Sequence, residues 1–200
     1  MKYSLVLIAV LALVLAACTK KQQTEAPKEL QSQQQSQMPA GHPDVSSMSS
    51  GSAVAGVTWT VPSGWTQGPQ KQMRVATYNV PPANGDQEGG ECGVFYFGPD
   101  QGGAVQMNID RWISQFENAK PKQTAKEVNG MKVEVVEIAG TYLAPSGPMM
   151  ESSGKKTNYR LLGAIVGAPE GSVFFKLTGP AKTIQATEGD FNALVSSLKK

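Results

Sequence analysis

The residues best suited to bind a metal lie in a polar segment near the N-terminus. His42 is the only histidine of the 200-residue chain, and Met38 and Met48 flank it. Thioether and imidazole ligands suit copper, so these three side chains form a candidate copper site. The same stretch contains Gly-His-Pro, which is typical of a turn in a solvated linker. The polar composition around it favours the linker, and copper binding stands as an alternative.

A single histidine outside the expected domain excludes several kinds of site within it. The domain cannot hold a Ser-His-Asp or Cys-His arrangement, nor a histidine-based zinc site. The chain has no Gly-x-x-x-x-Gly-Lys-Ser/Thr and no Gly-x-Gly-x-x-Gly, the loops that bind nucleotide phosphates. The formal charge is +2 and the lysine pairs are scattered, which does not suit nucleic acid. We therefore predict neither a cofactor nor a nucleic-acid partner.

Acidic side chains leave one route to catalysis open. Asp86, Glu88, Glu91, Asp100 and Asp110 lie in or near one end of the sheet expected below. Hydrolysis of a glycosidic bond needs two carboxyl groups about 5 to 9.5 Å apart, and sequence does not fix that distance. Because acidic loop residues are usually solvated, we predict that the protein is not an enzyme. A carboxylate-based hydrolase is the second alternative.

Two further features are candidates for function. Cys92 lies in an apolar strand, where a free cysteine is most simply a buried core residue; a redox role would need a lowered pKa. Met149 and Met150 lie in a long loop expected over residues 144–157. They offer an adaptable apolar contact for a partner or ligand, or else they fold onto the sheet edge.

The N-terminal sequence predicts where in the cell the protein is located. Lys2 precedes an apolar run over residues 5–15, which ends in Leu15-Ala16-Ala17-Cys18. Such a pattern is typical of a secretory signal, too short to span a membrane. Because cysteine follows the small residues, the stretch resembles the lipobox of bacterial lipoproteins. That resemblance implies a signal peptide of residues 1–17, a lipid on Cys18 and anchoring in the cell envelope. In a Gram-negative host it implies the outer membrane, facing the periplasm, because Thr19 is not the aspartate of an inner-membrane retention signal.

Composition divides the rest of the chain into two parts. Residues 18–53 are rich in Gln, Ser and Pro and cannot bury enough apolar surface to order themselves. We expect the lipidated Cys18 to begin a disordered tether there. Residues 54–200 predict a single domain, long enough to bury roughly two-thirds of its unfolded surface.

Hydrophobic patterns within the domain predict six or seven strands. We expect them to include residues 57–61, 73–80, 92–97, 132–139 with an extension to 143, 159–168 and 172–178. Three of these runs (92–97, 159–168 and 172–178) are apolar on both faces and therefore belong in the middle of the sheet. Asn129-Gly130 predicts a hairpin turn before the fourth.

Two stretches have the period of amphipathic helices. Their apolar stripes are Ile109, Trp112, Ile113 and Phe116, and then Phe191, Leu194, Val195 and Leu198. For the first helix we expect Asn108 as N-cap, Asp110 in the first turn and an end at Pro121. Thr187 and Asp190 have the spacing of a capping box before the second, and a short helical turn is expected between Gly179-Pro180 and Ala186. Core packing is the favoured role of Trp59, Trp65 and Trp112, with an aromatic pocket as the alternative.

These elements predict an α+β fold, a mainly antiparallel sheet with helices on both faces. Their order resembles the Mog1/PsbP-like α/β/α sandwich, through residues 59–65, Gly102-Gly103 and residues 194–199. A closer likeness is to uncharacterised bacterial lipoproteins that share the Pro-x-Gly-Trp start, a Met-Arg-x-Ala strand and Gly-Gly before a helix with Asn-x-x-Arg-Trp. That family implies no activity, whereas PsbP-like and Mog1-like proteins are accessory subunits and protein binders.

The sequence thus predicts a membrane-anchored envelope lipoprotein that serves as a non-catalytic protein-binding or accessory module. Its expected partners are the membrane, through the lipid on Cys18, and an envelope protein, through the loop with Met149 and Met150. Binding of a small ligand or copper is the alternative.

Overall fold

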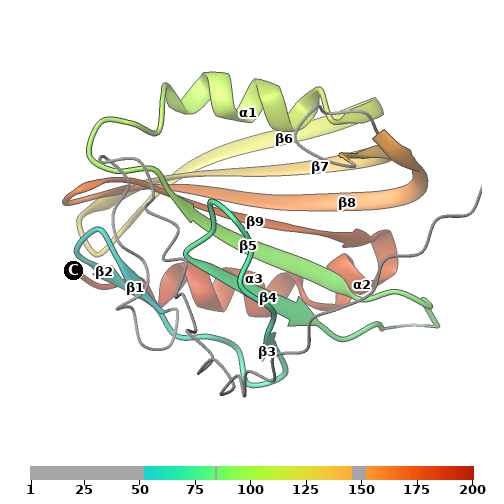
Figure 1. Ribbon diagram of the computed structural model, residues 1–200, viewed down its shortest axis with the longest axis horizontal. Helices are drawn as coiled ribbons and strands as arrows, with labels where there is room; N and C mark the ends of the chain where they lie inside the picture. The colour runs from blue at the N-terminus through green and yellow to red at the C-terminus, as the bar shows by residue number, and fades with distance from the viewer. Residues whose placement is uncertain (1–51, 84, 146–151) are drawn as a thin grey trace, which may run out of the picture. The chain divides into compact units, whose positions relative to one another are not determined.

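A seven-stranded sheet forms the frame of the residues that the computed structural model describes, which are 52–83, 85–145 and 152–200 (Figure 1). The strand order is β3-β4-β5-β9-β8-β7-β6, and every neighbouring pair is antiparallel. The strands are β3 (Thr66–Gln67), β4 (Ala76–Val80), β5 (Gly90–Tyr96), β6 (Phe116–Val128), β7 (Met131–Pro145), β8 (Ser152–Ala168) and β9 (Gly171–Pro180). The predicted α+β class is confirmed.

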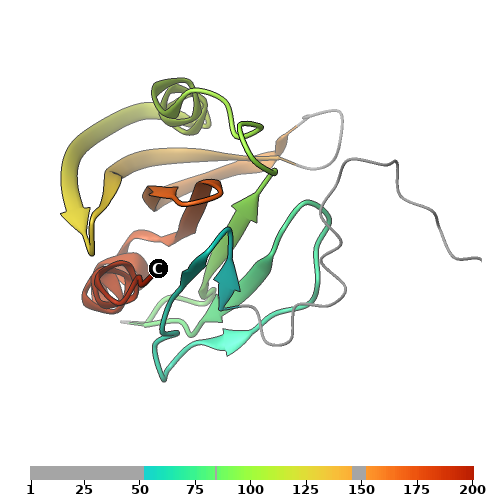
Figure 2. The same cartoon turned by 90° about the vertical axis from the view of Figure 1, so that its left-hand side faces the viewer.

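Helices cover both faces of this sheet, as predicted (Figures 1 and 2). Helix α1 (Val105–Ile113) lies on one face, which we call the α1 face. Helices α2 (Ala181–Ala186) and α3 (Glu188–Ser196) lie on the opposite, α3 face. No helix in the described ranges is both long and apolar enough to cross a membrane.

A small hairpin adds to the α3 face. It consists of β1 (Ala53–Val54) and β2 (Val57–Thr58), so the strand expected over residues 57–61 is shorter and pairs outside the main sheet. Thr58 and Lys199 exchange two backbone hydrogen bonds of 2.8 and 3.0 Å, which tie this hairpin to the segment after α3.

The strands that are apolar on both faces, β5, β9 and β8, occupy the middle of the sheet, as predicted. Successive residues of a strand point to opposite faces. On β9, Phe174 therefore joins the apolar cluster of Trp112 on the α1 face, while Phe175 joins that of Phe191 on the α3 face. Each face has its own core.

The three tryptophans are core residues, which confirms the favoured interpretation. They are 4–6% exposed. On the α3 face, Trp59 Nε1 donates to the Tyr78 hydroxyl at 3.0 Å and Trp65 Nε1 donates to Thr187 Oγ1 at 3.1 Å. Both indole N–H groups are thus satisfied, as burial requires.

The first predicted helix is wrong at its C-terminal end. Helix α1 ends at Ile113, and Phe116 begins β6. Phe116 still packs in the α1-face cluster, which explains why it fits the helical stripe. Pro121 does not end a helix but lies within β6, which is an edge strand and so tolerates a residue without an N–H group. The predicted turn after β6 is confirmed, with positive φ at Asn129 and Gly130.

The predicted caps also differ from the structure. Ala104 occupies the N-cap position of α1, and the first turn contains no acidic residue, so neither Asn108 nor Asp110 has its expected place. Asn108 instead donates from Nδ2 to the carbonyl oxygens of Gly102 at 2.8 Å and Ala104 at 3.0 Å, which secures the start of the helix from inside. For α3 the predicted positions are confirmed, because Thr187 is the N-cap residue and Asp190 lies in the first turn, but Thr187 makes no side-chain cap bond.

The loop expected over residues 144–157 is shorter than predicted. Strand β7 continues to Pro145, and β8 begins at Ser152. The pairing shifts register between Gly140 and Tyr142 and again between Leu143 and Pro145. Such irregularities let two strands continue past residues that interrupt a regular ladder.

Candidate functional site

Six residues singled out from the sequence lie outside the described ranges. They are Cys18, Met38, His42, Met48, Met149 and Met150. Lipid attachment, the copper site and the methionine contact therefore stay predictions.

Cys92 is a core residue of the α3 face. It is 0% exposed, and burial raises the pKa of its thiol to about 12. A thiolate is the reactive form of cysteine, and this thiol stays protonated at neutral pH. The structural interpretation of Cys92 is confirmed.

Two of the five candidate carboxylates have structural partners elsewhere. Asp86 Oδ2 accepts hydrogen bonds from the backbone N and the Oγ1 of Thr183, both at 2.8 Å, and so holds the loop before β5 against α2. Asp110 accepts a hydrogen bond from Gln106 at 2.8 Å on an exposed part of α1. Only Glu88 and Glu91 line a common pocket.

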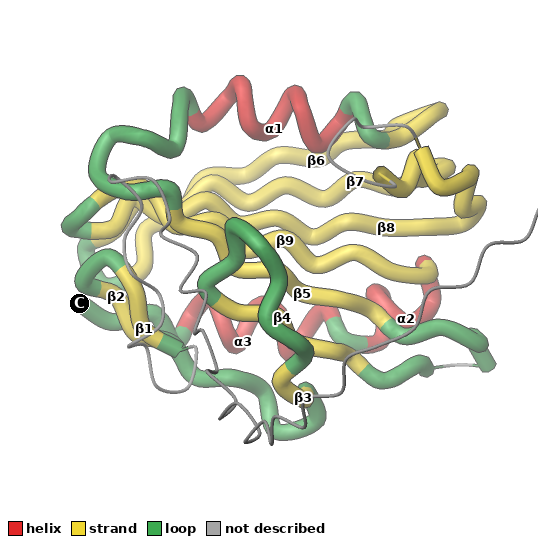
Figure 3. Tube along the Cα trace, in the orientation of Figure 1, coloured by secondary structure: helices red, strands yellow, loops and turns green. Residues whose placement is uncertain are grey.

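That pocket lies on the α1 face, over the part of the sheet that α1 does not cover. Helix α1 packs on β6 and β7, and in the part of the chain that the structure describes no helix lies above β3, β4 and β5 on this side (Figure 3). The pocket has a volume of about 670 Å³ and is lined by residues of β3, β4, β5 and β9 and by the adjoining parts of β7 and β8. This volume falls within the range of small-molecule sites.

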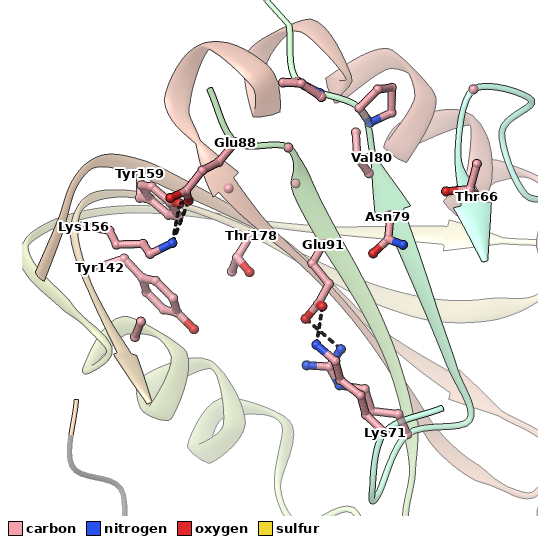
Figure 4. A pocket seen from close by; sticks show the side chains of 18 residues that line it. Thr66, Lys71, Asn79, Val80, Glu88, Glu91, Tyr142, Lys156, Tyr159 and Thr178 are labelled. Atoms are coloured by element: carbon pink, nitrogen blue, oxygen red, sulfur yellow. Dashed lines mark hydrogen bonds and ion pairs between the residues drawn. The ribbon is translucent and has the colours of Figure 1, made fainter. Parts of the chain in front are cut away.

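Glu91 holds one side of the pocket. It accepts a hydrogen bond from Lys71 (Figure 4) and another, 2.8 Å long, from Arg74 Nη1. Burial raises the pKa of Glu91, but the hydrogen bonds and charges of Lys71 and Arg74 outweigh it, so the pKa is lowered. The Arg74 guanidinium also lies 5.3 Å from the centre of the Phe95 ring and is 20% exposed.

Glu88 holds the other side. It accepts hydrogen bonds from Lys156 Nζ at 2.6 Å and from the Tyr159 hydroxyl at 2.5 Å (Figure 4). These two hydrogen bonds lower the pKa of Glu88. Tyr159 in turn stacks on Tyr142, with ring centres 5.9 Å apart and an interplanar angle of 6°.

Lys176 lies beside the pocket, in the middle of the sheet. It pairs with Gly93 of β5 and with Gly163 of β8. A Cβ at Gly163 would lie 2.4 Å from the Trp112 ring, and a Cβ at Gly93 would lie 3.2 Å from Arg74 Cζ. The two glycines thus leave room for large side chains on either side of Lys176.

The surroundings of the Lys176 ammonium are mostly cationic. Its Nζ donates to Gln115 Oε1 at 2.5 Å and lies 5.7 Å from the centre of the Tyr142 ring. Burial, together with the charges of Arg74 and Arg111, lowers the pKa of Lys176 to about 8.

The two glutamates of the pocket do not suit general acid catalysis. A catalytic carboxylic acid needs a raised pKa, whereas both glutamates of the pocket have a lowered one. Among the described residues, no three His, Cys, Asp or Glu side chains gather to ligate a metal.

Sequence reasoning missed the cationic part of the site. Lys71 and Arg74 precede β4, and no spacing links them to Lys176 or Tyr142 far along the chain. One signal was available: Lys176 interrupts the apolar run from Val173 to Leu177. A charge within a strand that is apolar on both faces needs a special environment.

No protein-family model matches the chain, and no curated protein sequence is similar to it. Among solved structures, the chain is similar to the solution structure of cyanobacterial PsbP (CyanoP) from Synechocystis sp. PCC 6803. The TM-score is 0.44 and the sequence identity 11%, over 76% of this chain and 96% of that chain.

Proposed function

We propose that the protein is a non-catalytic ligand-binding module of the cell envelope, and that it holds a small ligand in the pocket of the α1 face. The observation that carries this proposal is the pocket itself. It has a volume of about 670 Å³ and is lined by both charged groups and tyrosine rings. Such a mixture of a few oriented polar groups and aromatic surface is typical of small-molecule sites.

The membrane location rests on the sequence. The charged start, the apolar run and Leu15-Ala16-Ala17-Cys18 support a lipid anchor on Cys18, in the outer membrane if the host is Gram-negative. A binding module attached in this way remains near the membrane while its pocket is free to take up a ligand.

Two open glycines provide the test. Gly64 lines the pocket, and a Cβ there would meet no atom within 4 Å; the same holds for Gly189 on α3, on the opposite face. A photo-crosslinking amino acid such as benzoylphenylalanine is introduced at position 64 or 189 of the full-length chain. After illumination of intact membranes, mass spectrometry identifies the adducts.

We expect an adduct of small-molecule mass from position 64 and none from position 189. A second test uses Gly64→Phe, which places a large ring at the pocket and should reduce the amount of bound ligand. Gly189→Phe, on the opposite face, should bind as much ligand as the wild-type protein. Absence of any adduct specific to position 64 contradicts the proposal.

A second candidate function is binding of an envelope protein, and one observation favours it. Ala144 and Lys156, which bracket Met149 and Met150 in sequence, both line the pocket. A partner at that loop would yield an adduct of protein size from position 64. Met149→Ala with Met150→Ala would then reduce its yield.

Copper binding in the segment of Met38, His42 and Met48 is a separate alternative. Titration of the full-length chain with Cu(I) tests it against His42→Ala. Equal binding by both proteins removes that site.

A further inference from the structure

We propose that the pocket recognises its ligand through an anionic group, a carboxylate or a phosphate, with Arg74 as the principal donor. The inference rests on the proposed function and adds the chemical class of the ligand. Three features of the α1 face support it: unused donors, an excess of positive charge, and an internal carboxylate that occupies only part of the site.

The unused donors belong to Arg74. Its hydrogen bonds, to Glu91 Oε1 at 2.8 Å and to Thr77 Oγ1 at 3.3 Å, both leave from Nη1. Nε and Nη2 have no hydrogen-bond partner within residues 52–83, 85–145 and 152–200. A guanidinium presents five N–H donors in one plane, an arrangement that matches the oxygens of carboxylate and phosphate.

Positive charge is in excess around these donors. Lys71 and Arg74 share the carboxylate of Glu91. Lys176 lies close enough to Arg74 and Arg111 for their charges to act on it, and Glu91 is the acidic group that acts on it among the described residues. Three cations, Lys71, Arg74 and Lys176, thus interact with the carboxylate of Glu91, while Glu88 on the other side of the pocket is paired with Lys156. An added anion would offset a repulsion that partial burial strengthens.

Glu91 behaves as an internal competitor in this arrangement. Its carboxylate engages Nη1 of Arg74 and the Lys71 ammonium, which keeps the arginine oriented in the empty pocket. Because Glu91 is itself an anion, it repels a second one. Its removal should therefore strengthen anion binding, whereas loss of Arg74 should weaken it.

Sulfate is a suitable probe because its charge does not change between pH 6 and 10. Its affinity for the full-length protein in detergent micelles is measured by calorimetry, with Arg74→Met and Arg160→Met as a matched pair. Arg160 pairs with Glu137 and Glu188 and is 19% exposed, against 20% for Arg74. We expect roughly tenfold weaker binding in Arg74→Met and unchanged binding in Arg160→Met. Equal affinities in the two variants overturn the proposal.

A second pair covers the case in which Arg74→Met does not fold. Glu91→Gln removes the internal anion, and Glu137→Gln removes a carboxylate that likewise faces two cations, Lys122 and Arg160. Sulfate should bind several-fold more tightly to Glu91→Gln and with unchanged affinity to Glu137→Gln. No gain in Glu91→Gln overturns the proposal on its own.

Further probes identify the source of the anion. Succinate, inorganic phosphate and vesicles containing phosphatidylglycerol are compared, each against Arg74→Met. The probe that depends most strongly on Arg74 assigns the ligand as a free carboxylate, a free phosphate or a lipid headgroup; if none depends on Arg74, the anion inference falls. The pocket proposal would still stand if position 64 retained its specific adduct, so the two failures are distinguishable.

Discussion

The two faces of the sheet are built differently. On the α3 face, buried apolar side chains extend from β4 to β7, and two helices and a hairpin cover them. On the α1 face the buried apolar members end at β9, and charged residues take their place on and beside β4 and β5. Among the described residues, one nine-residue helix covers this side. The α3 face is thus covered along its length and forms a closed core, whereas the α1 face is covered only in part and forms a pocket beside its core.

The largest expected effect compares neighbours on β9. Phe175 is 0% exposed and meets Trp59 edge to face, with ring centres 5.1 Å apart, on the closed face. Phe174, on the other face, packs against the partly buried Phe97. We expect Phe175→Ala to lower the free energy of unfolding by about 3–5 kcal/mol and Phe174→Ala by less. Urea denaturation measures both, and a larger loss for Phe174→Ala would contradict the distinction between the faces.

The next largest effect is expected where α1 packs closely on the sheet. A Cβ at Gly163 would lie 2.4 Å from the Trp112 ring, whereas at Gly167 of the same strand the nearest atom is 3.6 Å away. Gly163→Ala should cost roughly 1–3 kcal/mol of unfolding free energy through overpacking. Gly167→Ala, the control, should change little. Similar losses in both variants would show that Trp112 moves aside freely.

Replacement of Lys176, beside the pocket of the α1 face, is expected to increase stability. The pKa of Lys176 is lowered from 10.5 to about 8, so its charge destabilises the folded state below pH 8, and this cost disappears as the pH rises towards 10.5. Lys176→Met should therefore raise the unfolding free energy on the order of 1–2 kcal/mol at pH 7. Urea denaturation at several pH values should show the difference shrinking between pH 8 and 10.5. A constant difference would mean that the ammonium is not the cause.

The smallest effect concerns a charge that belongs to neither core. Lys122 on edge strand β6 is 71% exposed and lies 3.5 Å from Glu137. Because exposed ion pairs are screened by water, Lys122→Ala should change the unfolding free energy by less than about 0.5 kcal/mol. Thermal unfolding of this variant gives the reference against which the other three effects are read.

Much of the fold could be predicted because its central elements carry their own signals. Runs that are apolar on both faces predicted the middle strands, and Asn129-Gly130 predicted a hairpin. Strand β6 was not predicted from the sequence because most of its side chains are exposed. It is recognisable as a strand only in the folded protein, where it forms the edge of the sheet. The role of Asn108 was mispredicted for a similar reason, since its hydrogen bonds depend on how Gly102 approaches the helix.

The site was harder to predict than the fold. Arg74 and Tyr142 lie on segments far apart in the sequence, and the order of the strands alone brings them to one pocket. The carboxylates of this region could be recognised in the sequence, but the basic side chains that pair with them could not. The sequence therefore left a pair of facing acids open as an alternative, whereas the structure shows Glu88 and Glu91 each paired with basic side chains.

The bridge between Thr58 and Lys199 has a consequence for the order of folding. Strands β6 to β9 form consecutive antiparallel pairs and can pair early, since contacts between segments close in sequence form at little entropic cost. The β1–β2 hairpin, by contrast, is held in place by Lys199, which lies far along the chain from Thr58. Trp59 and its apolar neighbours therefore stay exposed to water until this contact forms, which makes the docking of the β1–β2 hairpin a late step of folding.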